Sequence, residues 1–383
     1  MARTLKSDKI LFLAALVLVC ASVVMVYSAS AVQAMAKYQA SYFFLYKQLA
    51  WAIIGVGLMF GVMHVDYRVY RRPRLIWMLL GVTVVLLIGV FFFGERNNTQ
   101  RWITLGVASI QPSELAKLAS ILFTAALLER RMHRVNEPAY ALVPIGAVTF
   151  VLACLILREP DFGTTAVLIA IVAAMVFAAG VSWRYIAGAV LVLAPTAAAL
   201  VLSSPYRRER LLTFMDPWKD PLGNGFQIIH SLFAIGSGGV LGKGLMAGIE
   251  KLYYIPEPHT DFIYAVIGEE LGLIGTTITL VCFAIIAWRG LRACLLAPDR
   301  FGALVALGIT MMIALQALVN ISVVTAMLPT KGIPLPFVSN GGSSLLINLV
   351  AMGILLNISQ QSSATAAMAG HRVTDWTFSE QGA

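Results

Sequence analysis

Charged residues are scarce in this chain. Only 12% of its 383 residues are Asp, Glu, Lys or Arg, whereas 59% are hydrophobic, and the mean hydropathy is +0.82. Soluble globular proteins contain about 25% charged and about 45–50% apolar residues. The composition therefore excludes a water-soluble enzyme, a disordered chain and a nucleic-acid-binding domain with a solvated basic face.

Cysteine is also scarce, and its spacing indicates no metal site. The four cysteines are Cys20, Cys154, Cys282 and Cys294, and they are scattered through apolar runs or their flanks. This pattern matches neither a disulfide framework nor a set of zinc ligands. The sequence therefore predicts no bound metal from side-chain spacing.

Long apolar runs are what the chain has instead. A transmembrane helix needs about 20 mostly apolar residues, and ten segments approach this length. We predict an all-α polytopic integral membrane protein with ten transmembrane helices. The predicted spans are residues 10–30, 47–65, 75–94, 113–128, 140–157, 164–181, 185–203, 262–288, 301–326 and 343–358.

Basic residues gather on alternate connections between these segments. Arg68 to Arg74, Arg130 to Arg134 and the N-terminal residues Arg3, Lys6 and Lys9 lie on one side, whereas the short connections on the other side are poor in Lys and Arg. Cytoplasmic loops carry the excess of positive charge. The net charge of +9 is therefore explained by the membrane topology, with both termini in the cytoplasm. Binding to nucleic acid is not needed to explain it.

One connection is long enough to have a role of its own. Residues 204–261 form a predicted extracytoplasmic loop between the seventh and eighth spans, with a short apolar helix near Ile228 to Ile235. Residues 1–358 are predicted to form a single membrane domain, and the Ser/Ala/Gln-rich residues 359–383 a disordered cytoplasmic tail.

The glycine run from Gly236 to Gly244 lies in this loop. It departs from the nucleotide P-loop pattern at two positions, Ser237 and Gly244. Backbone N–H groups of such a run, with Lys243, could still hold a pyrophosphate. A plain flexible loop is the other interpretation.

Ionisable residues lie mostly on the outer half of the predicted spans, where they mark a functional site. Glu114 and Lys117 are three residues apart on one helical face and can form an ion pair, which is either structural or part of a site. Asp261 lies where the long loop meets the eighth span. Neighbouring His259 could serve a base or a metal, or be structural.

Several sequence strings resemble the SEDS family (shape, elongation, division and sporulation). They occur in the family's order from about residue 10 to residue 358, and the Pro-Thr-Lys-Gly-Ile-Pro version of the last resembles the division branch, FtsW, more than the elongation branch, RodA. The strings are Gln100–Ile103, Gln111–Lys117, Glu159–Thr164, Pro256–Ile263, Gly268–Gly272, and Pro329–Ser339 followed by Gly341–Ser344. Asn340, Ala326 and the pair Asn98-Thr99 depart from the usual pattern, with Ala326 in place of a common glycine.

The resemblance implies a peptidoglycan glycosyltransferase that polymerises lipid II at the outer face of the bacterial plasma membrane, in septal cell-wall synthesis for the division branch. It implies a class B penicillin-binding protein, a transpeptidase, as partner, besides other division proteins and membrane lipids. It also implies that Asp261 is essential. The residues that would line or support the cavity are Arg101, Trp102, Glu114, Lys117 and Lys331, and we add Lys243, His259 and Ser343 as candidate substrate contacts.

The predicted chemistry is glycosyl transfer with Asp261 as general base and basic residues around the pyrophosphate. A divalent cation, Mg²⁺ or Mn²⁺, could replace or supplement those basic residues. Two other functions stay open: a flippase for lipid-linked sugars, and a non-catalytic scaffold that recruits the transpeptidase. The absence of a detectable repeat and the small number of polar groups on the inner half disfavour the flippase.

Overall fold

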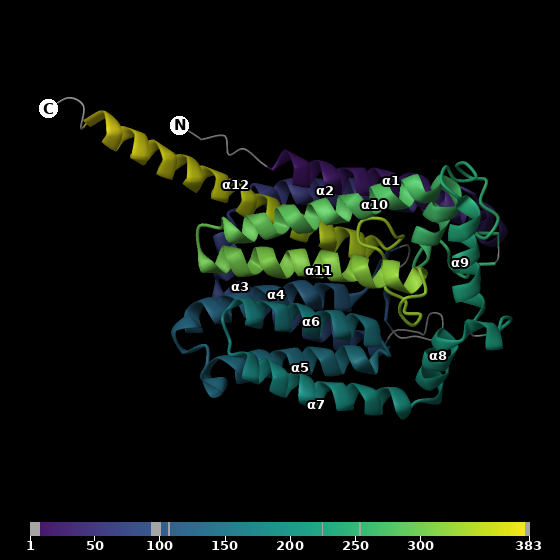
Figure 1. Ribbon diagram of the computed structural model, residues 1–383, viewed down its shortest axis with the longest axis horizontal. Coiled ribbons are helices and arrows are strands. Elements are labelled where there is room, and N and C mark those ends of the chain that lie inside the picture. Colours follow the sequence, from purple (N-terminus) through teal and green to yellow (C-terminus); the bar gives the residue numbers. More distant parts are fainter. Residues whose placement is uncertain (1–7, 93–100, 106–107, 224, 253, 380–383) are drawn as a thin grey trace.

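The computed structural model describes residues 8–92, 101–105, 108–223, 225–252 and 254–379 (Figure 1). Asn98-Thr99 and the first basic residues, Arg3 and Lys6, lie outside these ranges. The described chain is a bundle of roughly parallel and antiparallel helices, and each of the ten predicted segments overlaps one of them. The long helices are α1 Lys9–Tyr38, α2 Phe43–Met63, α3 Pro73–Gly89, α4 Pro112–Arg131, α5 Val143–Arg158, α6 Phe162–Ala178, α7 Trp183–Leu202, α10 Ile263–Leu295, α11 Arg300–Val324 and α12 Gly342–Ser379.

Within the described residues, seven helical stretches are long and apolar enough to cross a membrane. They correspond to α1, α2, α3, α5, α10, α11 and the first part of α12. The chain is therefore a multi-pass membrane protein. The other three predicted spans correspond to α4, α6 and α7, which lie alongside the rest (Figure 1), and ten spans remain a prediction.

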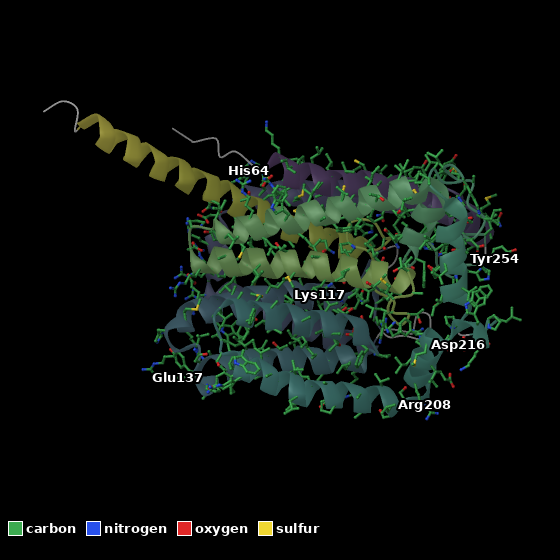
Figure 2. All side chains as sticks on the ribbon, in the orientation of Figure 1. His64, Lys117, Glu137, Arg208, Asp216 and Tyr254 are labelled. Atoms are coloured by element: carbon green, nitrogen blue, oxygen red, sulfur yellow. The ribbon has the colours of Figure 1, made fainter. Side chains whose placement is uncertain are left out.

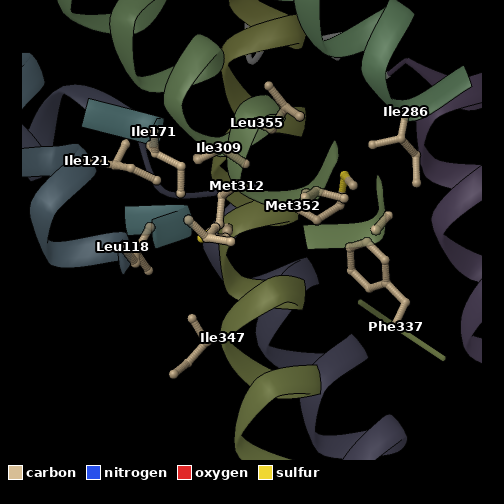
Figure 3. Packing of buried hydrophobic residues seen from close by; sticks show 14 of the residues in the cluster. Leu118, Ile121, Ile171, Ile286, Ile309, Met312, Phe337, Ile347, Met352 and Leu355 are labelled. Atoms are coloured by element: carbon tan, nitrogen blue, oxygen red, sulfur yellow. The ribbon is translucent and has the colours of Figure 1, made fainter. Parts of the chain in front are cut away.

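The centre of the bundle is built from α4, α6, α11 and α12. Figure 3 shows Ile121 of α4 and Ile309 and Met312 of α11 among the buried side chains, together with Ile347 and Met352 of α12. Helix α12 also packs tightly against α2, where a Cβ at Gly55 would lie 2.6 Å from Leu349 Cδ1. This packing sets the frame that holds the connecting loops at one end.

Helix α7 differs from the others in its burial. Its side chains that the structure describes are exposed or partly exposed, including the large apolar side chains of Trp183, Leu191 and Val192. It contacts α6 and lies at the edge of the bundle. Its apolar residues therefore face outward rather than the protein core.

The long loop contains two helices, α8 Pro205–Met215 and α9 Phe226–Gly238. Helix α9 confirms the short helix predicted near Ile228 to Ile235, and it lies across the ends of α10 and α11 (Figure 1). Short helical turns complete the chain: η1 Tyr67–Arg71, η2 Val90–Phe92, η3 Met132–Arg134, η4 Pro138–Leu142 and η5 Pro217–Lys219.

Two features differ from the sequence predictions. Strands β1 Ile103–Leu105 and β2 Ala108–Ile110 form an antiparallel hairpin, with Ile103 opposite Ile110, in a chain predicted to be wholly helical. Three-residue strands are too short to give a periodic signal. In addition, α12 runs on to Ser379, past residue 358, where the last predicted span ends.

Candidate active site

Four segments far apart in the sequence meet at the end of the bundle that carries the long loop. They are the hairpin region 101–111, the turn 159–164, the end of the long loop at 259–261, and the segment 330–344 before α12. Hydrogen bonds and ion pairs connect them, as described below. We call this convergence the Asp261 site.

Arg101 and Asp161 join the first two segments. Arg101 Nε donates to the Glu159 carbonyl at 3.1 Å and Nη2 donates to the Pro160 carbonyl at 2.6 Å, while Nη1 lies 4.0 Å from Asp161 Oδ1. Asp161 is the N-cap of α6 and accepts from Thr164 N. The turn therefore fixes Arg101 chiefly through carbonyl groups, which orient a guanidinium without neutralising its charge.

Asp261 lies just before α10 and is partly exposed. Its own carbonyl accepts from Asn320 Nδ2 at 2.8 Å, and the same amide nitrogen donates to the Ile333 carbonyl at 2.7 Å. On its other side, a Cβ at Gly332 would lie 2.9 Å from Asp261 Oδ2 and 4.0 Å from Arg101 Nη1. Backbone anchoring and a close glycine thus hold this carboxyl group beside the Arg101 guanidinium.

The electrostatic surroundings suit Asp261 to proton transfer. Burial raises the pKa of Asp261 to about 7, against the opposing charge of Arg101. A general base works best when its pKa lies near the working pH. The geometry therefore supplies a carboxylate that can accept a proton near neutral pH, next to a fixed cation.

Glu159 is the second acid of the site with a raised pKa. Burial and the neighbouring Asp161 raise its pKa to about 8. Its side chain is fully buried, and neither carboxyl oxygen has a hydrogen-bond partner among the described residues. Glu159 is therefore protonated at neutral pH.

Glu114 and Lys117 form the predicted ion pair, deeper in the bundle than Asp261. Lys117 Nζ lies 2.9 Å from Glu114 Oε1 and 2.5 Å from Gln316 Oε1, and Ser344 Oγ donates to Glu114 at 3.2 Å. Both charged side chains are almost completely buried, and Figure 2 shows Lys117 within the bundle. The pair joins α4 to α11 and α12.

Ser343 links this cluster to the hairpin. Its hydroxyl oxygen accepts from Gln111 N at 3.1 Å, and Gln111 Nε2 donates to Asp161 Oδ2 at 3.3 Å. The predicted contact residue Ser343 thus supports the backbone around the site. A continuous set of polar contacts runs from Ser343 through Gln111 to Asp161.

The remaining predicted residues lie around this set. Trp102 is half-buried directly before β1. His259 is buried, its ring lies 4.6 Å from that of Phe44, and its carbonyl accepts from Asn340 N. Lys331 Nζ lies 4.5 Å from the centre of the Phe162 ring. His259 thus connects the end of the long loop to the segment before α12. Lys331 lies in that segment, two residues from Ile333 and close to Asp261.

Lys243 lies in another cluster. Its Nζ is 2.8 Å from Glu269 Oε1, and Lys251 Nζ is 2.5 Å from Glu270 Oε1. Both glutamates are fully buried at the start of α10, just before the kink at Gly272. The charge of Lys243 is thus directed to Glu269, which weakens its prediction as a pyrophosphate ligand.

Several residues of the site were missed in the sequence. Gln316 and Asn320 are polar residues four apart in the apolar helix α11, a signal that marks buried polar contacts in membrane helices. Gly332 gave no such signal, because its position beside Asp261 depends on how the loops fold. Within the described residues, no three His, Cys, Asp or Glu side chains form a group that could hold a metal ion.

The sequence matches a family model described as "Cell cycle protein", covering FtsW, RodA and SpoVE, over residues 8–364. It is 43% identical to stage V sporulation protein E of Bacillus subtilis over 93% of this chain and 97% of that protein. It is 42% identical to the probable peptidoglycan glycosyltransferase FtsW of Geobacter metallireducens over 94% of this chain and 96% of that protein.

Solved structures show the same fold. One, from a study of the structural coordination of polymerization and crosslinking by a peptidoglycan synthase complex, has a TM-score of 0.77 and 30% identity, covering 94% of this chain and 99% of that chain. The crystal structure of the Thermus thermophilus rod shape determining protein RodA has a TM-score of 0.68 and 26% identity, covering 93% and 97%. The similarity therefore extends over nearly the whole of each chain.

Proposed function

This chain belongs to the FtsW, RodA and SpoVE family of cell cycle proteins and is a peptidoglycan glycosyltransferase of the plasma membrane, and we propose that Asp261 is its general base. The proposed substrate is lipid II, a disaccharide-pentapeptide on a polyprenyl pyrophosphate. Its lipid would lie in the bilayer and its sugars beside the Asp261 site.

The proposed reaction is a displacement at the anomeric carbon of the donor sugar. An acceptor hydroxyl attacks this carbon, its proton passes to the Asp261 carboxylate, and the bond from the carbon to the pyrophosphate oxygen breaks. The pyrophosphate leaves with the electron pair of that bond. General-base assistance of this kind contributes about 10²–10⁴-fold in rate.

Positive charge is needed where the pyrophosphate leaves. Arg101, held beside Asp261, is the first candidate, and Lys331 in the neighbouring segment is the second. Lys117 is paired with Glu114, so we assign that pair to positioning α4 beneath the site. Trp102, His259 and Ser343 are proposed to shape the site, as is Lys243 through the loop.

The observation that carries the proposal is the position of Asp261. It is a partly exposed carboxyl group with a pKa of about 7, beside a guanidinium held by carbonyl groups. A membrane scaffold needs no such arrangement, and a flippase needs polar groups that reach both faces.

The cellular assignments are finer proposals. We propose that the enzyme works at the division septum, with a class B penicillin-binding protein as transpeptidase and with other division proteins. The match to FtsW and to a chain from a complex that polymerises and crosslinks supports this. Residues 1–358 are proposed to act as one membrane domain.

The test is an assay of lipid II polymerisation by the purified chain together with its transpeptidase. A β-lactam inhibits the transpeptidase, and the length of the glycan product is measured on a gel. Asp261→Asn should make no polymer although it folds. Asp216→Asn is the matched control, because Asp216 lies in the same loop and pairs with exposed Lys219; Figure 2 shows it on the outer surface. Polymer from Asp261→Asn at the wild-type rate would refute the assignment, and no polymer from the wild type would favour the flippase or the scaffold.

A further inference from the structure

The glycine run Gly236–Gly244 of the long loop packs directly against the kinked start of α10. A Cβ at Gly242 would overlap the carbonyl oxygen of Glu270, and a Cβ at Gly272 would overlap the backbone nitrogen of Gly242. Gly239, Gly242 and Gly272 also have positive φ values, which glycine adopts without steric cost. The glycines therefore allow two backbones to approach closely.

Backbone hydrogen bonds run in both directions between this run and α10, on either side of the kink at Gly272. They are Lys243 N to Glu269 O, Gly244 N to Glu270 O, Leu273 N to Gly239 O and Ile274 N to Val240 O, at 2.9–3.3 Å. Peptide groups without a partner cannot face the hydrocarbon of a bilayer. The pairing therefore makes this part of the loop compatible with an apolar environment.

Leu273 lies within the membrane-spanning part of α10. Arg289, near the other end of the helix, forms an ion pair with Asp8 at the start of α1, at 2.7 Å, and marks the polar edge of the bilayer there. At 1.5 Å per residue, Leu273 lies about 24 Å along α10 from Arg289. The hydrocarbon core is thicker than this, at about 30 Å. The Gly239 carbonyl, which accepts from Leu273 N, therefore lies at the depth of the acyl chains.

The side chains of residues 239–252 divide into two sets. The large apolar side chains are exposed, and they include Val240, Leu241, Leu245, Met246 and Ile249. The charged side chains are paired with other side chains of the loop or of α10: Lys243 with Glu269, Lys251 with Glu270, and Glu250 with His230 of α9. Apolar groups outside and paired charges inside are what a surface in contact with lipid requires.

We propose that residues 239–252 form a re-entrant segment that lies in the outer leaflet, with its exposed apolar side chains among the acyl chains of the lipids. The exposed apolar face of α10 continues this surface through Leu273, Ile274 and Ile278. Because α10 is a membrane-spanning helix, this continuity favours lipid over a soluble partner. The inference does not depend on the role of Asp261 in catalysis.

The re-entrant segment also gives the loop a mechanical role. Its hydrogen bonds and ion pairs attach it to the start of α10, which begins at Ile263, directly after the Asp261 site. Lipid contact would thus hold Asp261 at a constant depth relative to the lipid headgroups.

The first test uses the wild-type chain in lipid nanodiscs that contain a phospholipid with a photoactivatable diazirine in the upper part of one acyl chain. Crosslinked peptides are identified by mass spectrometry. We expect crosslinks in residues 240–249 as well as in 273–281 of α10, and none in the charged region 205–219.

Two native methionines of the loop provide a matched comparison in the same nanodiscs. Met246 is 50% and Met215 75% exposed, so exposure alone predicts similar rates of oxidation by hydrogen peroxide in the water phase. We expect Met246 to stay reduced while Met215 is converted to the sulfoxide.

A second test compares Leu241→Asp with Leu222→Asp in nanodiscs. Both leucines are exposed, but only Leu241 belongs to the re-entrant segment. A charge among acyl chains is costly, whereas a charge on a surface in water is close to neutral for stability. We expect a lower melting temperature for Leu241→Asp alone. If Leu241→Asp does not fold, the labelling of the wild type still decides.

Crosslinks in α10 without crosslinks in residues 240–249, or equal oxidation of the two methionines, would overturn the proposal. The labelling is repeated with the transpeptidase present. Protection of Met246 only in that complex would assign the surface to a protein partner and would likewise refute a lipid contact.

Discussion

Gly332 and Asp261 approach each other so closely that a Cβ at position 332 would lie 2.9 Å from Asp261 Oδ2. The contact involves the end of a short side chain, which can move at little cost in stability. In the proposed mechanism, its position decides whether it reaches the acceptor hydroxyl. We therefore expect the space beside this carboxyl group to matter for function rather than for folding.

We expect Gly332→Ala to polymerise lipid II at least about 10-fold more slowly with an unchanged melting temperature, because a displacement of about 1 Å can cost about 10²-fold in rate. Gly341→Ala is the control: its new Cβ would be in ordinary contact with Ser344, at 3.5 Å. Equal activities of the two variants would contradict the prediction.

The rate of polymerisation should depend on the ionisation of Asp261. Its pKa is raised to about 7 and a base must be ionised to accept a proton, so kcat/KM should rise with pH up to about pH 7 and then level off. Below the pKa the rate should fall about tenfold per pH unit. Since the charge of Arg101 lowers this pKa, Arg101→Gln should move the rise to higher pH. A profile that is flat from about pH 5 to pH 8 would exclude Asp261 as the base.

Glu159 should make the fold less stable as the pH rises. Its pKa is raised from an ordinary 4.5 to about 8, so between these values the folded protein holds a proton that the unfolded chain releases. The free energy of unfolding should then fall with rising pH, by at most about 1.4 kcal/mol per pH unit. Glu159→Gln, which resembles the protonated acid, should lose this dependence in melting curves recorded across the window. Parallel curves for wild type and variant would be the contrary result.

Variants of the buried pair of Lys117 and Glu114 distinguish a contribution to stability from a contribution to catalysis. Lys117→Met leaves the Glu114 carboxylate buried without its cation and should lower the free energy of unfolding by about 3–5 kcal/mol. The double variant Glu114→Gln/Lys117→Met removes both charges and should recover most of that loss. If the double variant also polymerises normally, the pair is structural only; a stable double variant with low activity places the pair in the function.

Replacing Ala326 by glycine should stabilise the folded protein. It follows the end of α11 with φ 58°, a left-handed conformation that disfavours a side chain. Ala326→Gly should therefore raise the free energy of unfolding by about 1 kcal/mol. Ala303→Gly, within the same helix, should lower it by about as much. A lower melting temperature for Ala326→Gly would show that its methyl group makes a contact worth more than the backbone strain.

The sequence predicted those features that depend on composition and on neighbours along the chain. Apolar length located the long helices, and the spacing of Glu114 and Lys117 predicted their ion pair. The short helix in the loop followed from the same local rules. The resemblance brought Arg101 and Asp261 to one site and predicted the enzyme class, which the family match confirms.

The features that were missed depend on how distant segments fold together. Gly332 lies beside Asp261, and Arg210 contacts the Thr330 carbonyl, only because α8 and the segment before α12 meet. The ion pair of Lys243, a predicted pyrophosphate contact, with Glu269 was likewise not visible in the sequence. The hairpin was missed because each strand has only three residues.

The ion pairs of Lys243 and Lys251 with Glu269 and Glu270 connect the second half of the long loop to the protein differently from the first half. Backbone N–H groups of Met246, Ile249 and Glu250 also donate to these two glutamates, so several contacts bind residues 243–251 to the start of α10. Helix α8, by contrast, reaches the segment before α12 through the hydrogen bond of Arg210. A force on the second half of the loop would therefore be transmitted to the start of α10, directly after Asp261.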